Sequence, residues 1–481
     1  MTRICLYLGF LIGMTATLAA PIFANELPFV VKQKLQQLTI PETMIGVYVH
    51  EIGASRPVLT INADSGMNPA SVMKLLTTYA GLELLGPAYA WQTKLYANGK
   101  ITDGILYGDL IIKGYGDPKL NLENFWLLIH RLRQTGLFEI KGNLILDHSY
   151  YEIPHEDPGE FDGQPHRTYN VLPEAFLVNY RASTLHLFPQ PKKNSVRVVI
   201  DPVPESLQIQ NNLKLTQDKC GIWQNSLTIE AIADERNKNN FTVALNGSFS
   251  RHCGKQSYML SLHDSTIYTR DLFKHLWTQQ GGIFDGNAIL GQTPQHLLPL
   301  KIYHSPPLSD IVRGINKFSN NIAARQLYLA LGTGNSVIDS SPATLAKSDA
   351  AVRRWLASKQ LNFPELMIEN GSGLSRTERI SARHMGQLLL AAFKSPVMPE
   401  FIASLPIAAV DGTLKNRFTD TPIKGLAHMK TGTLNNVRAL AGYLIDEMGR
   451  RVVIVFFINH DQAEQSHAIM DTLVQWVYRR K

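Results

Sequence analysis

Apolar residues near the start of the chain follow first the period of strands and then the period of a helix. Alternation over Ile45–Glu51 and over residues 58–62 predicts two strands joined by a turn. Leucines and a tyrosine then recur at helical spacing until Gly86 interrupts the pattern. We therefore predict a mostly buried helix across residues 68–86, with Ser71 in its first turn.

The last third of the chain alternates helical and strand patterns in the same way. Helices are predicted over residues 321–331, 342–358, 381–392 and 463–478, and strands over residues 437–445 and 452–459. Strands near both ends of the chain suggest that the two ends share one sheet. The amphipathic terminal helix could make peripheral contact with a membrane, although such a helix more often packs on its own sheet.

Between these parts, from about residue 92 to residue 295, the pattern changes to short strands, turns and loops with little helix. Strands are predicted over residues 105–113, 142–147, 184–187, 195–200, 227–232 and 241–245, followed by a helix over residues 268–280. A length of 481 residues also exceeds what one core usually organises. We therefore expect one or two largely β domains inserted into an α/β (α+β) enzyme.

The first residues have the order of a secretory signal peptide. Arg3 precedes an apolar stretch, and Ala24 offers a small residue for cleavage before a polar segment. We predict a signal peptide over residues 1–24 and a periplasmic mature protein; an uncleaved N-terminal anchor is the alternative. Two cysteines then remain, Cys220 and Cys253, which in an oxidising compartment predict a disulfide rather than two free thiols.

Charge and cysteine spacing narrow the classes of partner. The net charge of +7 fits an anionic polymer or surface, although the charges are dispersed along the chain. No arginine-rich or aromatic-interleaved stripe indicates nucleic acid. No H-E-x-x-H or C-x-x-C spacing is present, so neither a metal nor another cofactor is predicted.

The first candidate for chemistry is Ser71-Val-Met-Lys74. A serine hydroxyl needs a nearby base at neutral pH, and residues three apart on a helix lie on one face. Lys74 can therefore reach Ser71, and burial or a second cation would lower its pKa toward that of a usable base. The motif also fits a capping serine followed by a surface lysine.

Two further motifs carry candidate residues. Ser319-Asn-Asn321 precedes a helix, where Ser and Asn are ordinary caps; functionally, Ser319 could relay a proton while Asn321 donates to a substrate amide. Lys430-Thr-Gly-Thr433 leads into the strand Val437–Ile445. There Gly432 would let a substrate backbone approach an edge strand, Thr431 and Thr433 could bind a carboxylate, and Thr433 N–H could stabilise an oxyanion. A turn before a strand is the alternative.

The three motifs in this order are the signature of penicillin-binding proteins and class A β-lactamases. Some 245 residues separate Lys74 from Ser319, and a class A β-lactamase has no room for so long a separation. The chain thus resembles the D-alanyl-D-alanine carboxypeptidase/endopeptidases, the low-molecular-mass class C penicillin-binding proteins. Accessory stretches that carry the resemblance are residues 114–120, 169–173, 370–376, 381–383 and 411–414.

The resemblance implies a serine β-lactamase/transpeptidase-like catalytic domain that is split in sequence. Its parts would be residues 25–91 and 296–481, around inserted domains over residues 92–295, in which residues 92–180 and 265–295 form one domain and about 181–264 a nested β domain. It implies Ser71 as nucleophile, Lys74 as base, Ser319 as proton relay, and Asn321, Lys430, Thr431 and Gly432 as substrate-binding residues. Which group acts as base in acylation is disputed for such enzymes.

The implied activity is removal of terminal D-alanine and cleavage of peptidoglycan cross-links, with β-lactams as covalent inhibitors. Two alternatives stay open: a β-lactam-hydrolysing enzyme or esterase on the same fold, and a non-catalytic peptidoglycan-binding protein. Asn370 stands where the family more often has Asp, which leaves the hydrogen bonding of that loop undetermined. An acidic group for the diaminopimelate amine is not identified by sequence; Asp162 and Glu174 are candidates.

Overall fold

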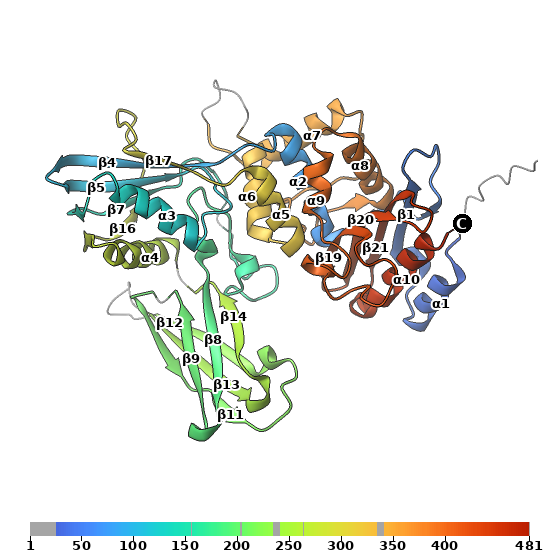
Figure 1. Cartoon of the computed structure of the whole chain (residues 1–481), viewed down its shortest axis with the longest axis horizontal. Coiled ribbons are helices and arrows are strands. Elements are labelled where there is room, and N and C mark those ends of the chain that lie inside the picture. The colour runs from blue at the N-terminus through green and yellow to red at the C-terminus, as the bar shows by residue number, and fades with distance from the viewer. Residues whose placement is uncertain are drawn as a thin grey trace, which may run out of the picture.

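The computed structural model describes residues 26–154, 156–202, 204–233, 241–262, 264–333 and 341–480, so the predicted signal peptide lies outside the described residues. Figure 1 shows three parts, each built on its own sheets, with α1 and α10, the first and last labelled helices, in the same part. Within the described ranges, no helix has the length and apolar character needed to cross a bilayer.

The part that holds the first and last described residues is built on a five-stranded antiparallel sheet. Its order is β19-β20-β21-β1-β2, and the strands are β1 (Ile45–Glu51), β2 (Leu59–Ile61), β19 (Ala427–Leu434), β20 (Val437–Ile445) and β21 (Arg451–Asn459). Ile45 of β1 pairs with Ile458 of β21, more than 400 positions along the chain. The prediction that the two ends share one sheet is confirmed.

Helices cover both faces of this sheet, which explains why its strands are apolar at nearly every position (Figure 1). In β21, Val453, Val455 and Phe457 face one core while Val452 and Ile454 face the other. The first core also contains α2 (Lys74–Leu84), α5 (Leu308–Phe318), α6 (Asn321–Leu331), α7 (Leu345–Ser358), α8 (Ala382–Lys394) and α9 (Met398–Ser404). The second contains α1 (Phe29–Gln37) and α10 (His467–Tyr478). A short pair, β3 (Gly66–Met67) and β18 (Ile380–Ser381), lies beside them.

The second part is a seven-stranded sheet packed against two helices. Its strands are β4 (Gln92–Thr102), β5 (Ile105–Gly114), β6 (Glu139–Ile140), β7 (Leu144–Asp147), β15 (Ile283–Phe284), β16 (Ala288–Leu290) and β17 (Lys301–His304), and its helices are α3 (Leu122–Arg133) and α4 (Ser265–Gln279). The prediction of a largely β domain missed α3, whereas α4 lies close to the helix predicted over residues 268–280. Asn121 caps α3, and Phe125, Leu128, Ile129 and Leu132 form its buried face. The predicted boundary at residue 295 also falls early, because β17 pairs with β4.

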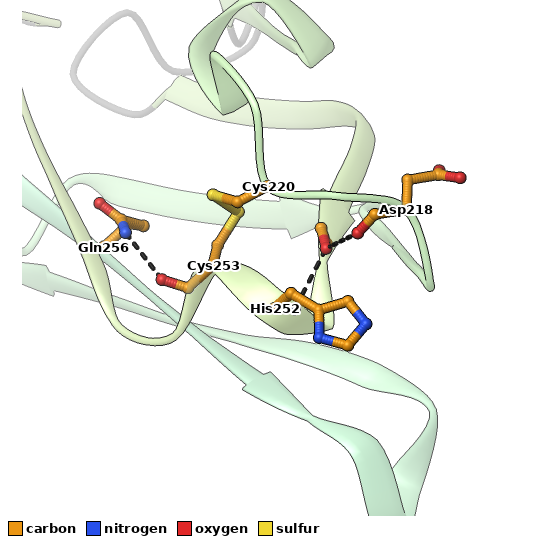
Figure 2. Close-up of a disulfide and its surroundings, with 6 residues drawn as sticks. Asp218, Cys220, His252, Cys253 and Gln256 are labelled. Atoms are coloured by element: carbon orange, nitrogen blue, oxygen red, sulfur yellow. Dashed lines mark hydrogen bonds between the residues drawn. A yellow bond between two sulfur atoms is a disulfide. The ribbon is translucent and has the colours of Figure 1, made fainter.

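The third part consists of two small sheets facing each other, β14-β8-β9 and the sheet around β13. The strands are β8 (Ser183–Gln190), β9 (Ser195–Asp201), β14 (Gln256–Leu260), β10 (Leu207–Asn211), β11 (Lys214–Thr216), β12 (Leu227–Ala233) and β13 (Phe241–Ser250). Figure 2 shows the disulfide that joins Cys220 to Cys253, the pair predicted from sequence. Gln256 donates a hydrogen bond to the Cys253 carbonyl beside it (2.8 Å).

Candidate active site

Ser71 lies on a short turn that precedes a buried helix. The sequence places it in the first turn of an α-helix, but Ala70–Met73 form a 3-10 turn and α2 begins at Lys74. The reason is that Ala70 adopts a positive φ of 45° and its N–H donates to Asn68 Oδ1 (2.8 Å). Asn68 in turn donates to the Ser375 carbonyl (2.9 Å), so the turn is held from outside the helix.

Lys74 connects this turn to the rest of the site. Its side chain is fully buried, and its Nζ lies 3.0 Å from Ser71 Oγ and 2.6 Å from Asn321 Oδ1, with the Ser372 carbonyl as a third partner. Burial lowers the Lys74 pKa well below its ordinary value, and the charge of Lys430 lowers it further. A neutral amine can donate to Asn321 and Ser372 and accept the Ser71 proton. The contacts thus suit a general base.

The Ser319-Asn320-Asn321 triplet lies between α5 and α6, and each of its three residues makes different contacts. Ser319 ends α5 in the left-handed region (φ 57°). Asn320 is the cap of α6 and accepts from Ala323 N–H (2.9 Å). The capping role therefore falls to Asn320, which leaves the Ser319 hydroxyl and the Asn321 carboxamide to face the two lysines.

Lys430 forms the second serine–lysine pair of the site. It is buried on β19, and its Nζ donates to Ser319 Oγ (2.9 Å) and to the Thr431 carbonyl (2.6 Å). Burial lowers the pKa of Lys430 to about 7. Two hydroxyl–amine pairs, one centred on Ser71 and the other on Ser319, are therefore held in one buried cluster.

The Lys430–Thr433 segment lies within the edge strand β19 and not in a turn before β20. Met429 N–H points away from β20 and donates to the Pro406 carbonyl (2.9 Å). Because N–H direction alternates along a strand, the N–H groups of Thr431 and Thr433 point to the same outer edge. Thr431 Oγ1 also donates to Thr413 Oγ1 (2.7 Å), which adds a hydroxyl that sequence did not assign. This edge can receive an extended peptide.

The structure adds a packing constraint at Gly432 that was not predicted from the sequence. A Cβ at this position would lie 2.6 Å from the Pro69 carbonyl oxygen and 3.1 Å from Ala70 Cβ. The glycine therefore lets β19 pack directly on the turn that carries Ser71, and its predicted role beside the substrate backbone stays a prediction. Sequence reasoning could not find this contact because 363 positions separate the partners, Pro69 and Gly432.

A loop over residues 369–375 completes the site. Asn370 donates through Nδ2 to the Leu374 carbonyl (2.9 Å) and accepts through Oδ1 from Ser372 N–H (2.9 Å), which settles its hydrogen bonding. Gly373 has a φ of 79°, and a Cβ there would lie 1.9 Å from the Ala70 carbonyl oxygen. The stretch was noted in the sequence, but the contact of Ser372 with Lys74 and the role of Glu378, described below, were not predicted.

A segment of the second part reaches the same site. Phe161 and Tyr169 pack against the small cluster that contains Ala70 and Leu434. Asp162, one of the acidic candidates, accepts from Tyr169 Oη (2.7 Å) and so holds this segment together. The other, Glu174, accepts from Ser265 Oγ (2.5 Å) and lines a different cavity. A cavity of about 260 Å³ instead presents Glu156, Asp157, Glu160, Arg325, Glu369 and Arg376.

Across the parts of the chain that the structure describes, no group of three or more His, Cys, Asp or Glu side chains is arranged to hold a metal ion.

Comparison with known proteins identifies the family of this chain. A family model described as the D-Ala-D-Ala carboxypeptidase 3 (S13) family matches residues 29–480. The D-alanyl-D-alanine carboxypeptidase DacB of Haemophilus influenzae is 26% identical over 451 residues, which cover 93% of this chain and 91% of that protein. The D-alanyl-D-alanine carboxypeptidase of Actinomadura sp. (strain R39) is 25% identical, over 90% of this chain and 82% of that protein.

The fold is likewise similar to a solved structure. Penicillin binding protein 4 (dacB) from Haemophilus influenzae superimposes with a TM-score of 0.75 at 24% identity, covering 94% of this chain and 99% of that one. The same protein complexed with a β-lactam gives a TM-score of 0.73. The match over residues 29–480 leaves little of the chain outside the family model. This chain belongs to the D-Ala-D-Ala carboxypeptidase 3 (S13) family.

Proposed function

We propose that this chain is a serine-type D-Ala-D-Ala carboxypeptidase and DD-endopeptidase that acts on peptidoglycan through an acyl-enzyme on Ser71. The observation that carries the proposal is the buried cluster in which Lys74 Nζ lies 3.0 Å from Ser71 Oγ and Lys430 Nζ lies 2.9 Å from Ser319 Oγ. A nucleophile, a base and a separate proton donor are thereby held in one place beside a strand edge.

The reaction follows from these positions. Ser71 Oγ attacks the carbonyl carbon of the penultimate D-alanine while its proton passes to the neutral Lys74 amine. The N–H groups of Ser71 and Thr433 stabilise the oxyanion. The C–N bond then breaks. The departing amine takes a proton from the Ser319 hydroxyl, and Lys430 replaces that proton. In the second half, water attacks the acyl carbonyl and gives a proton through Ser319 to Lys430. The bond to Ser71 Oγ then breaks, and Ser71 takes its proton back from Lys74, so that both lysines return to their starting states.

Substrate recognition uses the edge of β19 and the residues around it. The peptide lies along the strand, Thr431 and Thr413 bind the terminal carboxylate, and the Asn321 carboxamide holds a backbone amide of the stem. The neighbouring 260 Å³ cavity, with acidic Glu156 and Glu160 and basic Arg376, suits the amine and carboxylate at the end of a diaminopimelate side chain. It replaces Asp162 and Glu174 as the candidate acidic site.

β-Lactams fit the same cleft, as the β-lactam complex of the Haemophilus influenzae protein illustrates for that relative. We propose that they acylate Ser71 and leave it slowly, which separates this enzyme from a β-lactam-hydrolysing relative. The catalytic domain would comprise residues 25–91 and the chain after β17, with the second and third parts as inserted domains. The Cys220–Cys253 disulfide and the predicted signal peptide support a periplasmic location.

Digestion of purified cross-linked muropeptides, followed by mass spectrometry, tests the proposal. The mature enzyme should release D-alanine from pentapeptides and convert cross-linked dimers to monomers. Ser71→Ala should abolish both products, whereas Ser358→Ala, which removes a hydroxyl bonded to the Trp355 carbonyl on α7, should leave them unchanged. Undiminished products from Ser71→Ala, or intact muropeptides with the folded wild-type enzyme, would contradict the proposal.

A further inference from the structure

Glu378 is a fully buried carboxylate behind the loop that meets Lys74. Its Oε1 accepts hydrogen bonds from the backbone N–H groups of Glu369 (3.2 Å), Asn370 (3.0 Å) and Gly371 (2.9 Å). Three successive N–H groups that converge on one oxygen fix the backbone of the loop at its start. The turn that follows is therefore shaped by a buried carboxyl group and not by side-chain packing only.

The turn that Glu378 shapes touches both members of the nucleophile pair. Gly371 has a φ of 69°, and its carbonyl accepts from Thr77 Oγ1 on α2 (2.6 Å). The next carbonyl, that of Ser372, accepts from Lys74. A Cβ on Gly373 would lie 2.7 Å from Ser71 N, so the turn abuts the backbone of the nucleophile. A shift in this loop would move the partner of Lys74 and a wall of the oxyanion site together.

We propose, on the basis of the function proposed above, that Glu378 is a positioning residue for the acylation step: its carboxylate shapes the 369–373 turn against Ser71 and Lys74 and supplies a negative charge that offsets the positive field of Lys430 and Arg325 at Lys74.

The charges around Lys74 explain why such a group is required. Lys430 and Arg325 both lower the Lys74 pKa, whereas Glu378 is the carboxylate that raises it. Arg325 is itself buried on α6, with its Nε unpaired among the described side chains. The other titratable groups that act on Glu378 or Arg325 are Glu369, Glu156 and Tyr328. Without Glu378, two buried cations would act on Lys74 with little opposition.

Burial raises the pKa of Glu378, and its three amide hydrogen bonds oppose that rise. Asn370 matters here because it is an uncharged residue of the same turn, and its backbone N–H is one of the three that Glu378 accepts from. An aspartate in its place could not donate to the Leu374 carbonyl, and it would add a second carboxylate to the turn. This chain thus places the loop's buried charge at residue 378 and keeps residue 370 neutral.

The test is the pH dependence of the second-order rate of acylation by a fluorescent penicillin. Acylation requires neutral Lys74, so its acidic limb reports the Lys74 pKa. Glu378→Gln keeps an oxygen for the three N–H groups but removes the charge, which lowers the Lys74 pKa. The acidic limb should therefore move to lower pH by about one unit. A role in loop structure only would lower the rate without moving the limb.

Two further variants keep the test decisive if Glu378→Gln folds poorly. Glu378→Asp keeps the charge and displaces the oxygen, so the rate should fall while the limb stays at its wild-type pH. Asn370→Asp combined with Glu378→Gln returns a carboxylate to the loop and should move the limb back. The control is Glu365→Gln, which removes a carboxylate that accepts from Ser381 N–H (2.7 Å) away from Lys74; its limb should not move.

An unmoved acidic limb in a folded Glu378→Gln enzyme would overturn the inference, as would an equal downward shift in Glu378→Asp. Either result leaves the proposed function intact, because wild-type acylation still occurs. Failure of the wild-type enzyme to acylate would instead overturn the proposed function, so the two failures are distinguishable.

Discussion

The packing of β19 on the Ser71 turn leaves no room for a single additional methyl group. In Gly432→Ala, the new Cβ would lie 2.6 Å from the Pro69 carbonyl oxygen, where ordinary contacts begin at 3.4 Å. Ala439 Cβ at 3.0 Å and Ala70 Cβ at 3.1 Å are also close, so the new methyl group cannot avoid the carbonyl by shifting sideways. The strand and the turn must therefore separate by about 0.8 Å, the difference between 3.4 Å and 2.6 Å.

That separation has a cost in stability and a cost in rate. Overpacking of this kind destabilises a protein by about 1–3 kcal/mol. The same displacement moves Thr433 N–H away from the carbonyl that Ser71 attacks, and a misplacement of about 1 Å costs roughly 100-fold in rate. We expect the acylation rate of Gly432→Ala to fall about 10- to 100-fold, with a lower melting temperature.

The assay is stopped-flow acylation with a fluorescent penicillin, together with thermal unfolding of the same samples. Gly314→Ala is the matched control, because no atom lies within 4 Å of a Cβ at that position in α5. It should acylate at the wild-type rate and gain about 0.5–1 kcal/mol in stability. Wild-type acylation by Gly432→Ala would refute the reasoning and return this glycine to the role of admitting substrate.

Two other predictions concern charge and covalent stabilisation. Folded Lys430 releases its proton at a pH of about 7, whereas an unfolded lysine holds it until about pH 10.4, so the unfolded state binds more protons between these values. The free energy of unfolding should therefore rise with pH across this window, by up to about 1.4 kcal/mol per pH unit, and urea unfolding of Lys430→Met should show a smaller rise. Equal pH dependence in the two proteins would contradict a lowered pKa for Lys430. Replacing both Cys220 and Cys253 by Ser opens a link between residues 33 positions apart and should destabilise the β part by about 3–4 kcal/mol in urea unfolding. Penicillin labelling at 25 °C should stay at the wild-type level, and a parallel loss of labelling would show that the β part supports the site.

The elements that sequence located best have periodic patterns that tertiary contacts reinforce. Asn321–Leu331 and Val437–Ile445 begin and end where predicted, because a cap marks the helix start and the strand is buried on both faces. Helix α3 was missed although its cap and its apolar spacing are present, since the strand-rich neighbourhood dominated the interpretation. Local pattern and neighbourhood disagreed there, and the local pattern was right.

In the site, sequence predicted the reactive side chains but not the groups that position them. Motif spacing brought forward the serines and lysines whose side chains the structure gathers. It could not reveal Glu378, the backbone contact at Gly432, or the 3-10 geometry at Ala70, because each depends on a segment remote in sequence or on a backbone angle. Such residues contribute position and charge rather than reactive groups, and no short motif records them.

The central claim is that the Ser71 hydroxyl is the group that forms the acyl-enzyme. Tandem mass spectrometry of a protease digest, made after the purified enzyme has reacted with benzylpenicillin, locates the covalent adduct. We predict a single penicilloyl group on Ser71, in the peptide that also contains Lys74 or ends at it. An adduct on Ser319 or on another side chain, with Ser71 unmodified, would contradict the claim.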